Sequence, residues 1–236
     1  MPDEYCANGP EIDLVTFSSI GGVPIHYARP PVASYGCLGK PRTPRLDREF
    51  LAKLEPCFEE LWSIAPGGRA QAIVSGGCYV EKAGMHGAGR AIDIDAIWWP
   101  QDSDEPPLIT LYYPDDKLRY LGTEAILRKH LGLVLDFHYN RAHHDHFHCD
   151  DSQPVGFFKT ASRVVFVQAA CIYVFDKKIE HDSVWGPQTE SAVRSITSQL
   201  DSPDDILTLD GWLGFLDAIA LTAFKRVEAQ EVLAKP

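Results

Sequence analysis

Residues 91–96 alternate strictly between apolar and acidic side chains, apart from the alanines at either end. Successive side chains of a β-strand point to opposite faces, so Ile92 and Ile94 share one face while Asp93 and Asp95 share the other. This pattern predicts a half-buried strand with an open acidic face. A sheet built from such strands packs helices on its apolar face and leaves a polar face for chemistry, which favours an α+β fold.

Other helices and strands follow from hydrophobic periodicity and turn residues. An amphipathic helix is predicted over residues 46–64, where Pro56 is expected to kink or split it and Pro66-Gly67-Gly68 to end it. Further strands are predicted at 72–74, 108–113, 132–137 and 146–149, with a short helix at 123–131. Residues 1 to about 45 are rich in glycine and proline, so we expect an irregular extension packed on the domain.

The composition changes after Gln153-Pro154-Val155-Gly156, the best candidate for a linker. Residues 160–228 carry three helical patterns, at 164–175, 189–200 and 209–227, and almost no strand signal. We therefore expect two domains. Residues 1–156 are predicted to form an α+β domain with a small, mainly antiparallel sheet, helices and a cleft, and residues 157–236 an all-α domain of three helices.

Charge and composition argue against several classes of protein. The formal net charge is −11, whereas phosphate recognition needs a basic face, so no nucleic-acid partner is expected. No run of about 18 apolar residues occurs, so no membrane span is expected. The first ten residues contain Asp3 and Glu4 and no apolar stretch, unlike a secretory signal peptide. The cysteines form no C-x-x-C pair, which argues against a cysteine zinc site and leaves disulfides open; they are Cys6, Cys37, Cys57, Cys78, Cys149 and Cys171.

Two segments carry histidines and carboxylates at the spacing of a metal site. Six residues, glycines among them, separate His86 from Asp93, so a turn can bring His86 back toward the strand that bears Asp93. His146 and His148 share one face of a predicted strand, so one can bind a metal while the other orients chemistry beside it. Asp145 stands three residues before His148, where a carboxylate can take the proton of an attacking water. Catalytic zinc takes three such ligands and leaves one position for water.

A histidine cluster also has simpler explanations. Five of the nine histidines lie between His138 and His148, and such a cluster can be a solvated loop or an adventitious metal site. The separate pair of His86 and Asp93 on a strand disfavours these explanations. Asp95 shares the face of Asp93, and we interpret it as a supporting or solvated carboxylate rather than as the ligand.

The two segments also resemble a known family. His86 followed by Gly87-x-Gly89-Arg90-Ala91-Ile92-Asp93-Ile94, together with Tyr139-Asn140-Arg141-Ala142-His143-His144-Asp145-His146-Phe147-His148, is similar to the extensin-like C-terminal domain family over roughly residues 35–150. That family is related to the D-alanyl-D-alanine zinc metallopeptidases and, more distantly, to lysostaphin-type and hedgehog zinc sites. The resemblance implies the zinc ligands His86, Asp93 and His148, with Asp145 as the general base.

The C-terminal segment has a resemblance of its own. Val164-Val165-Phe166-Val167-Gln168-Ala169-Ala170, followed by Asp182-Ser183-Val184-Trp185-Gly186-Pro187-Gln188-Thr189, resembles the three-helix peptidoglycan-binding domain. The signature Asp-Gly-x-x-Gly-Pro-x-Thr is matched except that Ser183 replaces a glycine. Gly186-Pro187 alone also suits an ordinary helix start, because proline is favoured in the first helical turn.

Together these patterns predict a zinc-dependent peptidoglycan hydrolase that cleaves an amide bond in the peptide stem or cross-link, as a carboxypeptidase or an endopeptidase. Zn²⁺ is the expected cofactor, and peptidoglycan is the expected partner of a monomer that acts outside the cytoplasm at the cell wall. Asp145 is the expected proton acceptor and His146 the stabiliser of the oxyanion. The candidate substrate contacts are Tyr79, Arg90 and His143.

Several alternatives stay open at this point. The route of export is open, as is the choice between phage lysis, an injected effector and remodelling of a host's own wall. A non-catalytic wall-binding protein with a structural zinc is a second class of function, although such a protein has no use for a carboxylate at Asp145. A metal nuclease, a third class, conflicts with the acidic net charge.

Overall fold

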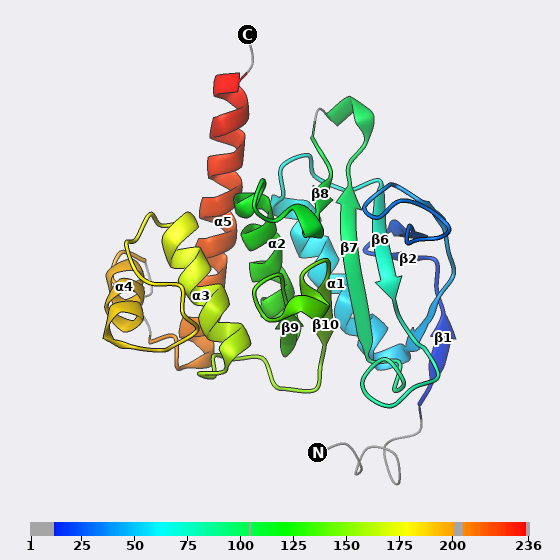
Figure 1. Ribbon diagram of the computed structural model, residues 1–236, viewed down its shortest axis with the longest axis horizontal. Coiled ribbons are helices and arrows are strands. Elements are labelled where there is room, and N and C mark those ends of the chain that lie inside the picture. The colour runs from blue at the N-terminus through cyan, green and yellow to red at the C-terminus, as the bar shows by residue number, and fades with distance from the viewer. Residues whose placement is uncertain (1–11, 104, 201–204, 235–236) are drawn as a thin grey trace.

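A mixed sheet forms the first layer of the computed structural model, which describes residues 12–103, 105–200 and 205–234 (Figure 1). Among these residues the main sheet has eight strands in the order β2-β3-β6-β7-β10-β9, with β4 beside β3 and β8 beside β7. Strands β3 and β6 run parallel and the other neighbours run antiparallel, as an α+β fold with a mainly antiparallel sheet predicts. The strands are β1 Leu14–Thr16, β2 Ser19–Ile20, β3 Val23–Tyr27, β4 Lys40–Pro41, β5 Arg45–Asp47, β6 Ala72–Gly77, β7 Ala91–Trp98, β8 Leu108–Ile109, β9 Leu133–Leu135 and β10 Phe147–Asp150.

The helices lie close to their predicted positions. They are α1 Arg48–Ile64, α2 Lys117–His130, α3 Ala161–Tyr173, α4 Pro187–Thr197 and α5 Leu209–Ala234, with short 3₁₀ turns η1 Gln101–Ser103, η2 Thr110–Tyr112 and η3 Arg141–His143. Most boundaries shift by a few residues, α5 extends to Ala234 rather than 227, and two further differences have a visible cause or form. Helix α2 begins at Lys117 rather than at residue 123, because Asp116 caps it by accepting a hydrogen bond from the backbone of Arg119. The strand predicted at 108–113 ends at Ile109 and continues as a 3₁₀ turn.

The prediction of an irregular N-terminal extension is wrong for the described part of that segment. Strand β3 belongs to the main sheet and pairs with β6 through Ile25 and His26, while Ile25 is 1% exposed. Strand β1 forms a separate two-stranded sheet with β5. These strands are too short to show periodicity, and their stability comes from pairing with strands distant in the sequence. Residues 1–11 of the predicted extension lie outside the described part of the chain.

Helix α1 runs through Pro56 as one continuous helix, so the proline does not split it. Its N-terminus is capped by Asp47, whose side chain accepts from the backbone of Phe50 at 3.3 Å. Pro56 lies on the exposed face of the helix, where water can satisfy the carbonyl that loses its helical partner. The opposite face buries Phe50, Leu54 and Phe58 in the core.

Helix α2 lies between the sheet and the C-terminal helices (Figure 1). It is buried on all sides from Leu118 to Arg128, and Arg128 within it forms an ion pair with Glu124 at 2.7 Å. Helix α5 approaches so closely that a Cβ at Gly122 would lie 2.7 Å from Phe224. One continuous apolar core therefore joins the α+β part and the helical part. The boundary near residue 156 stays a prediction.

No helix within the described residues combines the length and apolar character needed to cross a membrane, as expected. The described cysteines are free thiols, namely Cys37, Cys57, Cys78, Cys149 and Cys171. Cys6 lies outside the described residues.

Candidate metal centre

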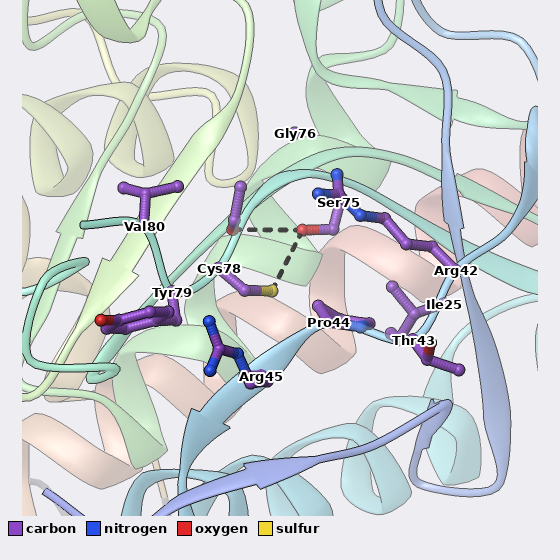
Figure 2. Close-up of a pocket in the computed structure, with 11 residues that line it drawn as sticks. Ile25, Arg42, Thr43, Pro44, Arg45, Ser75, Gly76, Cys78, Tyr79 and Val80 are labelled. Carbon is purple, nitrogen blue, oxygen red and sulfur yellow. Dashed lines mark hydrogen bonds between the residues drawn. The ribbon is translucent and has the colours of Figure 1, made fainter.

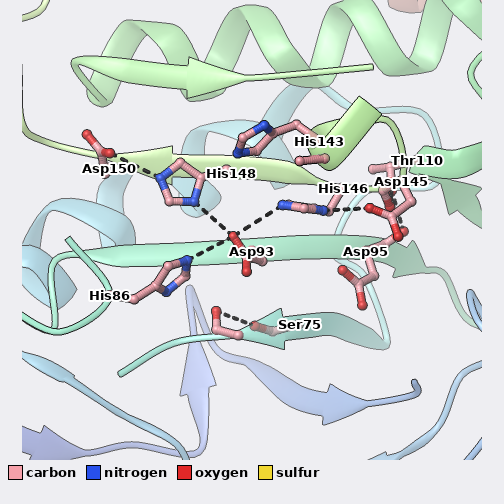
Figure 3. A network of polar contacts seen from close by, with 12 residues as sticks. Ser75, His86, Asp93, Asp95, Thr110, His143, Asp145, His146, His148 and Asp150 are labelled. Atoms are coloured by element: carbon pink, nitrogen blue, oxygen red, sulfur yellow. Dashed lines mark hydrogen bonds and ion pairs between the residues drawn. The ribbon is translucent and has the colours of Figure 1, made fainter. Parts of the chain in front are cut away.

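The antiparallel pairing of β7 and β10 brings the predicted ligands together. Its register places His148 directly opposite Asp93. His86 comes from the loop between β6 and β7, and Figure 3 shows its ring turned toward Asp93 from the other side. Residues opposite each other on neighbouring strands have close side chains, so this register makes a site from residues far apart in the sequence.

The three side chains converge on one carboxylate oxygen. Oδ1 of Asp93 lies 3.2 Å from Nε2 of His86 and 3.0 Å from Nδ1 of His148. Within the described residues, ligand atoms of these three side chains all lie within 4.8 Å of one another, as a shared metal ion requires. The structure therefore brings together the three side chains of the predicted ligand set.

In each of these two imidazoles, the nitrogen that faces away from Asp93 (the outer nitrogen) is hydrogen-bonded to an acceptor. Nδ1 of His86 donates to the backbone carbonyl of Cys78 at 2.7 Å, and Nε2 of His148 donates to Oδ2 of Asp150 at 3.1 Å. The other nitrogen of each ring faces Asp93, where it can carry either a proton that is donated to the carboxylate or a metal ion. The same arrangement orients histidines around metals in proteins, so these residues fit a metal ion.

The charges of the cluster also suit metal binding. Burial raises the pKa of Asp93, but hydrogen bonds from His148 and His86 outweigh it and hold that pKa far below its usual range. Asp93 is therefore ionised, as a metal ligand must be. Burial lowers the pKa of His148, but Asp150 and Asp93 raise it to about 9. A metal bound to Nδ1 then competes with a proton there.

His146 lies between Asp145 and Asp93. Its Nε2 is 3.5 Å from Oδ1 of Asp93, and its Nδ1 donates to Oδ1 of Asp145 at 2.7 Å. Asp145 therefore contacts the ligand cluster through His146 (Figure 3). The sequence predicted that Asp145 lies near the metal. In the structure His146 lies between Asp145 and Asp93.

Asp95 is buried rather than open to solvent, which corrects the expected open acidic face of β7. Its carboxylate is 0% exposed and accepts from Nε and Nη2 of Arg29, each at 2.7 Å. Such a bidentate pair satisfies a charge that burial would otherwise destabilise. The solvated alternative for Asp95 is thus wrong. Its backbone accepts from the hydroxyl of Thr110 at 2.8 Å.

Thr110 connects two parts of the site. The same hydroxyl lies 2.6 Å from the backbone carbonyl of Asp145, and Thr110 is 1% exposed. It therefore ties β7, which carries Asp93, to the loop that carries Asp145 and His146 (Figure 3). Thr110 is thus placed to set the position of Asp145.

The three candidate substrate contacts have different surroundings. His143 packs against His146 and His148, and burial together with those two rings lowers its pKa to about 4. The guanidinium of Arg45 lies over the ring of Tyr79, with its Cζ 4.8 Å from the ring centre. Arg90 is committed to structural ion pairs with Asp47, Glu49 and Asp151. Nδ1 of His143 also lies 2.8 Å from Oδ1 of Asn140, and a substrate would have to compete with carboxylates for Arg90.

Comparisons of the chain with protein-family models, with curated proteins and with solved structures find no match. The chemistry of the site therefore has to be inferred from its own residues. The imidazoles of His86 and His148 and the carboxylate of Asp93 converge on one point, and His146 and Asp145 lie beside them.

Several residues that support the site were not predicted from the sequence. Asp150 could have been found, because it lies two residues after His148 and so shares its face of β10. Cys78 acts through its backbone carbonyl, which has no sequence signal. Arg29 and Thr110 come from distant segments, and only the tertiary structure shows their roles.

The signature residues of the C-terminal segment surround one buried glutamine. Gln168 is 1% exposed, donates to Asp182 and Thr189, and accepts from the backbone of Asp182 and Ser183. Ser183, which replaces the glycine of the signature, has a φ of 63°. Glycine is favoured at that angle because it has no Cβ. The signature therefore describes a turn that connects α3 to α4, and Pro187 begins α4 as expected.

Proposed function

We propose that this chain is a zinc-dependent peptidoglycan hydrolase that cleaves an amide bond in the peptide stem or cross-link. One observation carries the proposal: two imidazoles with their outer nitrogens held converge with an ionised carboxylate on a single point. Zinc is favoured because it takes nitrogen and oxygen ligands in sets of three at hydrolytic sites. The ligand atoms would be Nε2 of His86, Oδ1 of Asp93 and Nδ1 of His148.

Zinc, when bound, would lower the pKa of a water to about 7 and polarise the scissile carbonyl. The chain itself has to orient that water and move its proton. Asp145 and His146 are hydrogen-bonded to each other beside the ligands, so a proton lost by the attacking water has an acceptor there. We assign the proton acceptance to Asp145 and the stabilisation of the developing oxyanion to His146. The same pair can return the proton to the leaving amine.

The alternative is a wall-binding protein with a structural zinc, and His146 is the residue on which the choice depends. Structural zinc sites are closed by four protein ligands, whereas catalytic sites keep one position open. Nε2 of His146 lies 3.5 Å from Asp93, yet His146 is not part of the set of ligand atoms that lie within 4.8 Å of one another. Three converging ligands with His146 outside them favour an open position and therefore catalysis.

The helical segment is proposed to bind peptidoglycan, on the strength of its signature resemblance and of the turn that the signature residues build around Gln168. Because the proposed substrate is the peptidoglycan of the cell wall, the proposal places the protein outside the cytoplasm. Because α5 packs on α2, wall binding is best tested with the full chain.

Purified sacculi incubated with the full chain test the proposal. We expect soluble peptide fragments to be released with zinc, and release to stop with a chelator and in His86→Ala and His148→Ala. Binding to sacculi without release would favour the structural alternative. Metal analysis should find about one zinc per chain, as three protein ligands for one ion require. Unchanged zinc affinity in both histidine variants would contradict the ligand assignment.

A further inference from the structure

Two buried carboxyl groups of the described chain meet without a donor between them. Glu124 lies in α2 and Asp136 follows β9, and both are 0% exposed. Oε2 of Glu124 and Oδ2 of Asp136 each lack a hydrogen-bond partner within the described residues. By contrast, the buried thiol of Cys78 lies 3.6 Å from the hydroxyl of Ser75 (Figure 2). Burying two acceptors without a donor is strongly unfavourable, so the two oxygens cannot both be bare acceptors.

One guanidinium faces both carboxyl groups. Nε and Nη2 of Arg128 bind Oε1 of Glu124 at 2.8 and 2.7 Å, and Nη2 lies 3.9 Å from Oδ2 of Asp136. The same Nη2 also donates to the backbone carbonyls of Val134 and Ser162. A single positive charge balances one carboxylate, so two ionised carboxylates here would leave a net negative charge buried, which is costly.

The other titratable groups around the pair in the described chain are neutral. Burial raises the pKa of the nearby phenols and thiols, namely Tyr113, Tyr120, Cys57 and Cys149. Burial also lowers the pKa of His138 to about 4. Charged groups on the elements packed against α2 lie against other groups: Glu60 of α1 and Asp217 of α5 pair with Lys129, Arg163 of α3 donates to the carbonyl of Gly132, and Lys117 lies over the ring of Tyr113.

Asp136 also holds the start of the loop that carries Asp145 and His146. Its Oδ1 accepts from the backbone N–H groups of His138 and Tyr139 at 3.0 and 2.9 Å. The chain then passes through η3 to Asp145 and His146. Because both oxygens belong to one planar group, a hydrogen bond that fixes Oδ2 of Asp136 also fixes the acceptor of this turn.

We propose that Glu124 and Asp136 share one proton in the folded protein, and that Glu124 is a positioning residue that acts through Asp136 on the loop bearing Asp145. A proton on Oε2 of Glu124 is donated to Oδ2 of Asp136, which leaves one carboxylate for the charge of Arg128. Burial and the neighbouring Asp136 raise the pKa of Glu124 far above its usual range, and Arg128 does not offset them. The positioning role rests on the proposed function, whereas the shared proton does not.

Glu124→Gln in the full chain tests the shared proton, because its NH₂ group can donate to Asp136 as the acid does. The unfolded chain loses the proton of Glu124 near its usual pKa of about 4.3, and the folded chain keeps it. Wild type should therefore lose stability relative to Glu124→Gln as the pH rises, by about tenfold in the unfolding equilibrium constant per pH unit. Denaturant unfolding of both proteins between about pH 5 and about pH 8 measures this difference.

The matched control is Glu105→Gln. Glu105 is also buried, and it is ion-paired with Arg119 of the same helix. Removing one partner of a buried ion pair should raise the unfolding equilibrium constant by about 100-fold or more, by an amount that does not change over this pH interval. If Glu124→Gln behaves in the same way, Glu124 is an ionised partner of Arg128 and the shared proton is overturned.

A double-mutant cycle gives a second readout of the shared proton. Asp136→Asn also supplies one donor, since its NH₂ group can face Glu124 while its carbonyl oxygen still accepts from the turn. Combining Glu124→Gln with Asp136→Asn supplies two donors and no acceptor. The double variant should be about 10-fold or more less stable than the single variants predict together. An additive double variant overturns the shared hydrogen bond, as does an infrared spectrum at neutral pH in which wild type shows no carboxylic acid C=O stretch that Glu124→Gln lacks.

Hydrogen exchange and hydrolysis test the positioning role. In the double variant the backbone N–H groups of His138 and Tyr139 should exchange about 10-fold faster than in Glu105→Gln, which weakens the fold elsewhere. Release of peptides from sacculi should fall in the double variant while zinc stays bound. Unchanged exchange or unchanged release overturns the positioning role and leaves the shared proton standing. A wild-type chain that releases nothing from sacculi removes the hydrolase, whereas the pH dependence and the cycle still decide the shared proton.

Discussion

Asp150 holds the outer nitrogen of His148, with 3.1 Å between Oδ2 and Nε2. Its other oxygen accepts from the backbone and the hydroxyl of Ser152, at 2.9 and 2.6 Å. Asp150 is 2% exposed, so both oxygens are satisfied within the protein. Asp150 therefore orients the imidazole of His148, and Ser152 in turn fixes the carboxylate of Asp150.

Asp150→Ala should weaken zinc binding by about 10- to 100-fold, the usual effect of losing a carboxylate behind a metal-binding histidine. Asp150→Asn should cost less, because its amide oxygen can still accept from Nε2 of His148. Competition with a chromophoric chelator measures both affinities. Equal zinc affinity in wild type and Asp150→Ala would contradict the role of Asp150 in orienting His148 for the metal.

Asp145→Asn should keep the fold and the zinc while hydrolysis falls by about 10² or more, as expected for losing a general base. The amide is close in shape but cannot take up the proton. Rates are measured on sacculi, and zinc content on the same sample. Loss of zinc would make Asp145 a ligand, and full activity would refute its role as proton acceptor.

Thr110→Val should lower kcat by about 10-fold with zinc affinity unchanged, because small displacements of catalytic groups reduce rates strongly. Valine matches threonine in shape but cannot bond the carbonyls of Asp95 and Asp145. Thr110→Ser keeps the hydroxyl and should restore most of the rate. If serine and valine behave alike, the hydroxyl does not position Asp145.

Ser183→Gly should stabilise the protein by about 0.5–1 kcal/mol, because a side chain at positive φ costs about 1–2 kcal/mol and glycine loses part of that gain through unfolded-state entropy. Ser183 has a φ of 63°. Ser183→Ala keeps the Cβ and serves as the control. Denaturant unfolding compares the three proteins, and a Gly variant no more stable than the Ala variant would contradict the expected strain.

Arg90→Gln should destabilise the fold by about 2–3 kcal/mol, because it leaves largely buried carboxylates without their main cation. Arg90 donates to Asp151 at 3.0 Å and to Asp47 at 2.8 Å. Thermal unfolding at pH 7 measures the loss. A fold of unchanged stability with a raised KM would instead make Arg90 a substrate contact.

This destabilisation should depend on pH. Burial raises the pKa of Asp151, but Arg90 and Lys53 outweigh it and lower that pKa below its usual range. A lowered folded-state pKa contributes stability at pH values above the usual range, and the contribution is lost as the pH falls through the lowered value. The difference between wild type and Arg90→Gln should therefore narrow between pH 7 and about pH 3. A difference that stays constant over this interval would mean that the ion pair with Asp151 does not cause it.

Local patterns in the sequence were enough to place many of the elements. The alternation at 91–96 predicted β7, and helical periodicity predicted α1, α3 and α4 within a few residues and the start of α5 at Leu209. Such patterns work because each of these segments has one buried side or one apolar run that its own residues define. The spacing of His86 and Asp93 predicted a metal site, the family resemblance completed the ligand set with His148, and the structure brings those side chains together.

What the sequence could not show depends on contacts between distant segments. Strand β3 has too few residues for a periodic pattern and is held by β6, nearly fifty residues away along the chain. Asp95 looked solvated because the pattern of β7 gives no sign of Arg29, which buries and neutralises it. The sequence by itself determined which side chains can hold a metal, since ligand chemistry belongs to residue type. The tertiary structure alone decided which acceptors orient those ligands and which two buried carboxyl groups meet, because both follow from where the folded chain places its carbonyls and carboxylates.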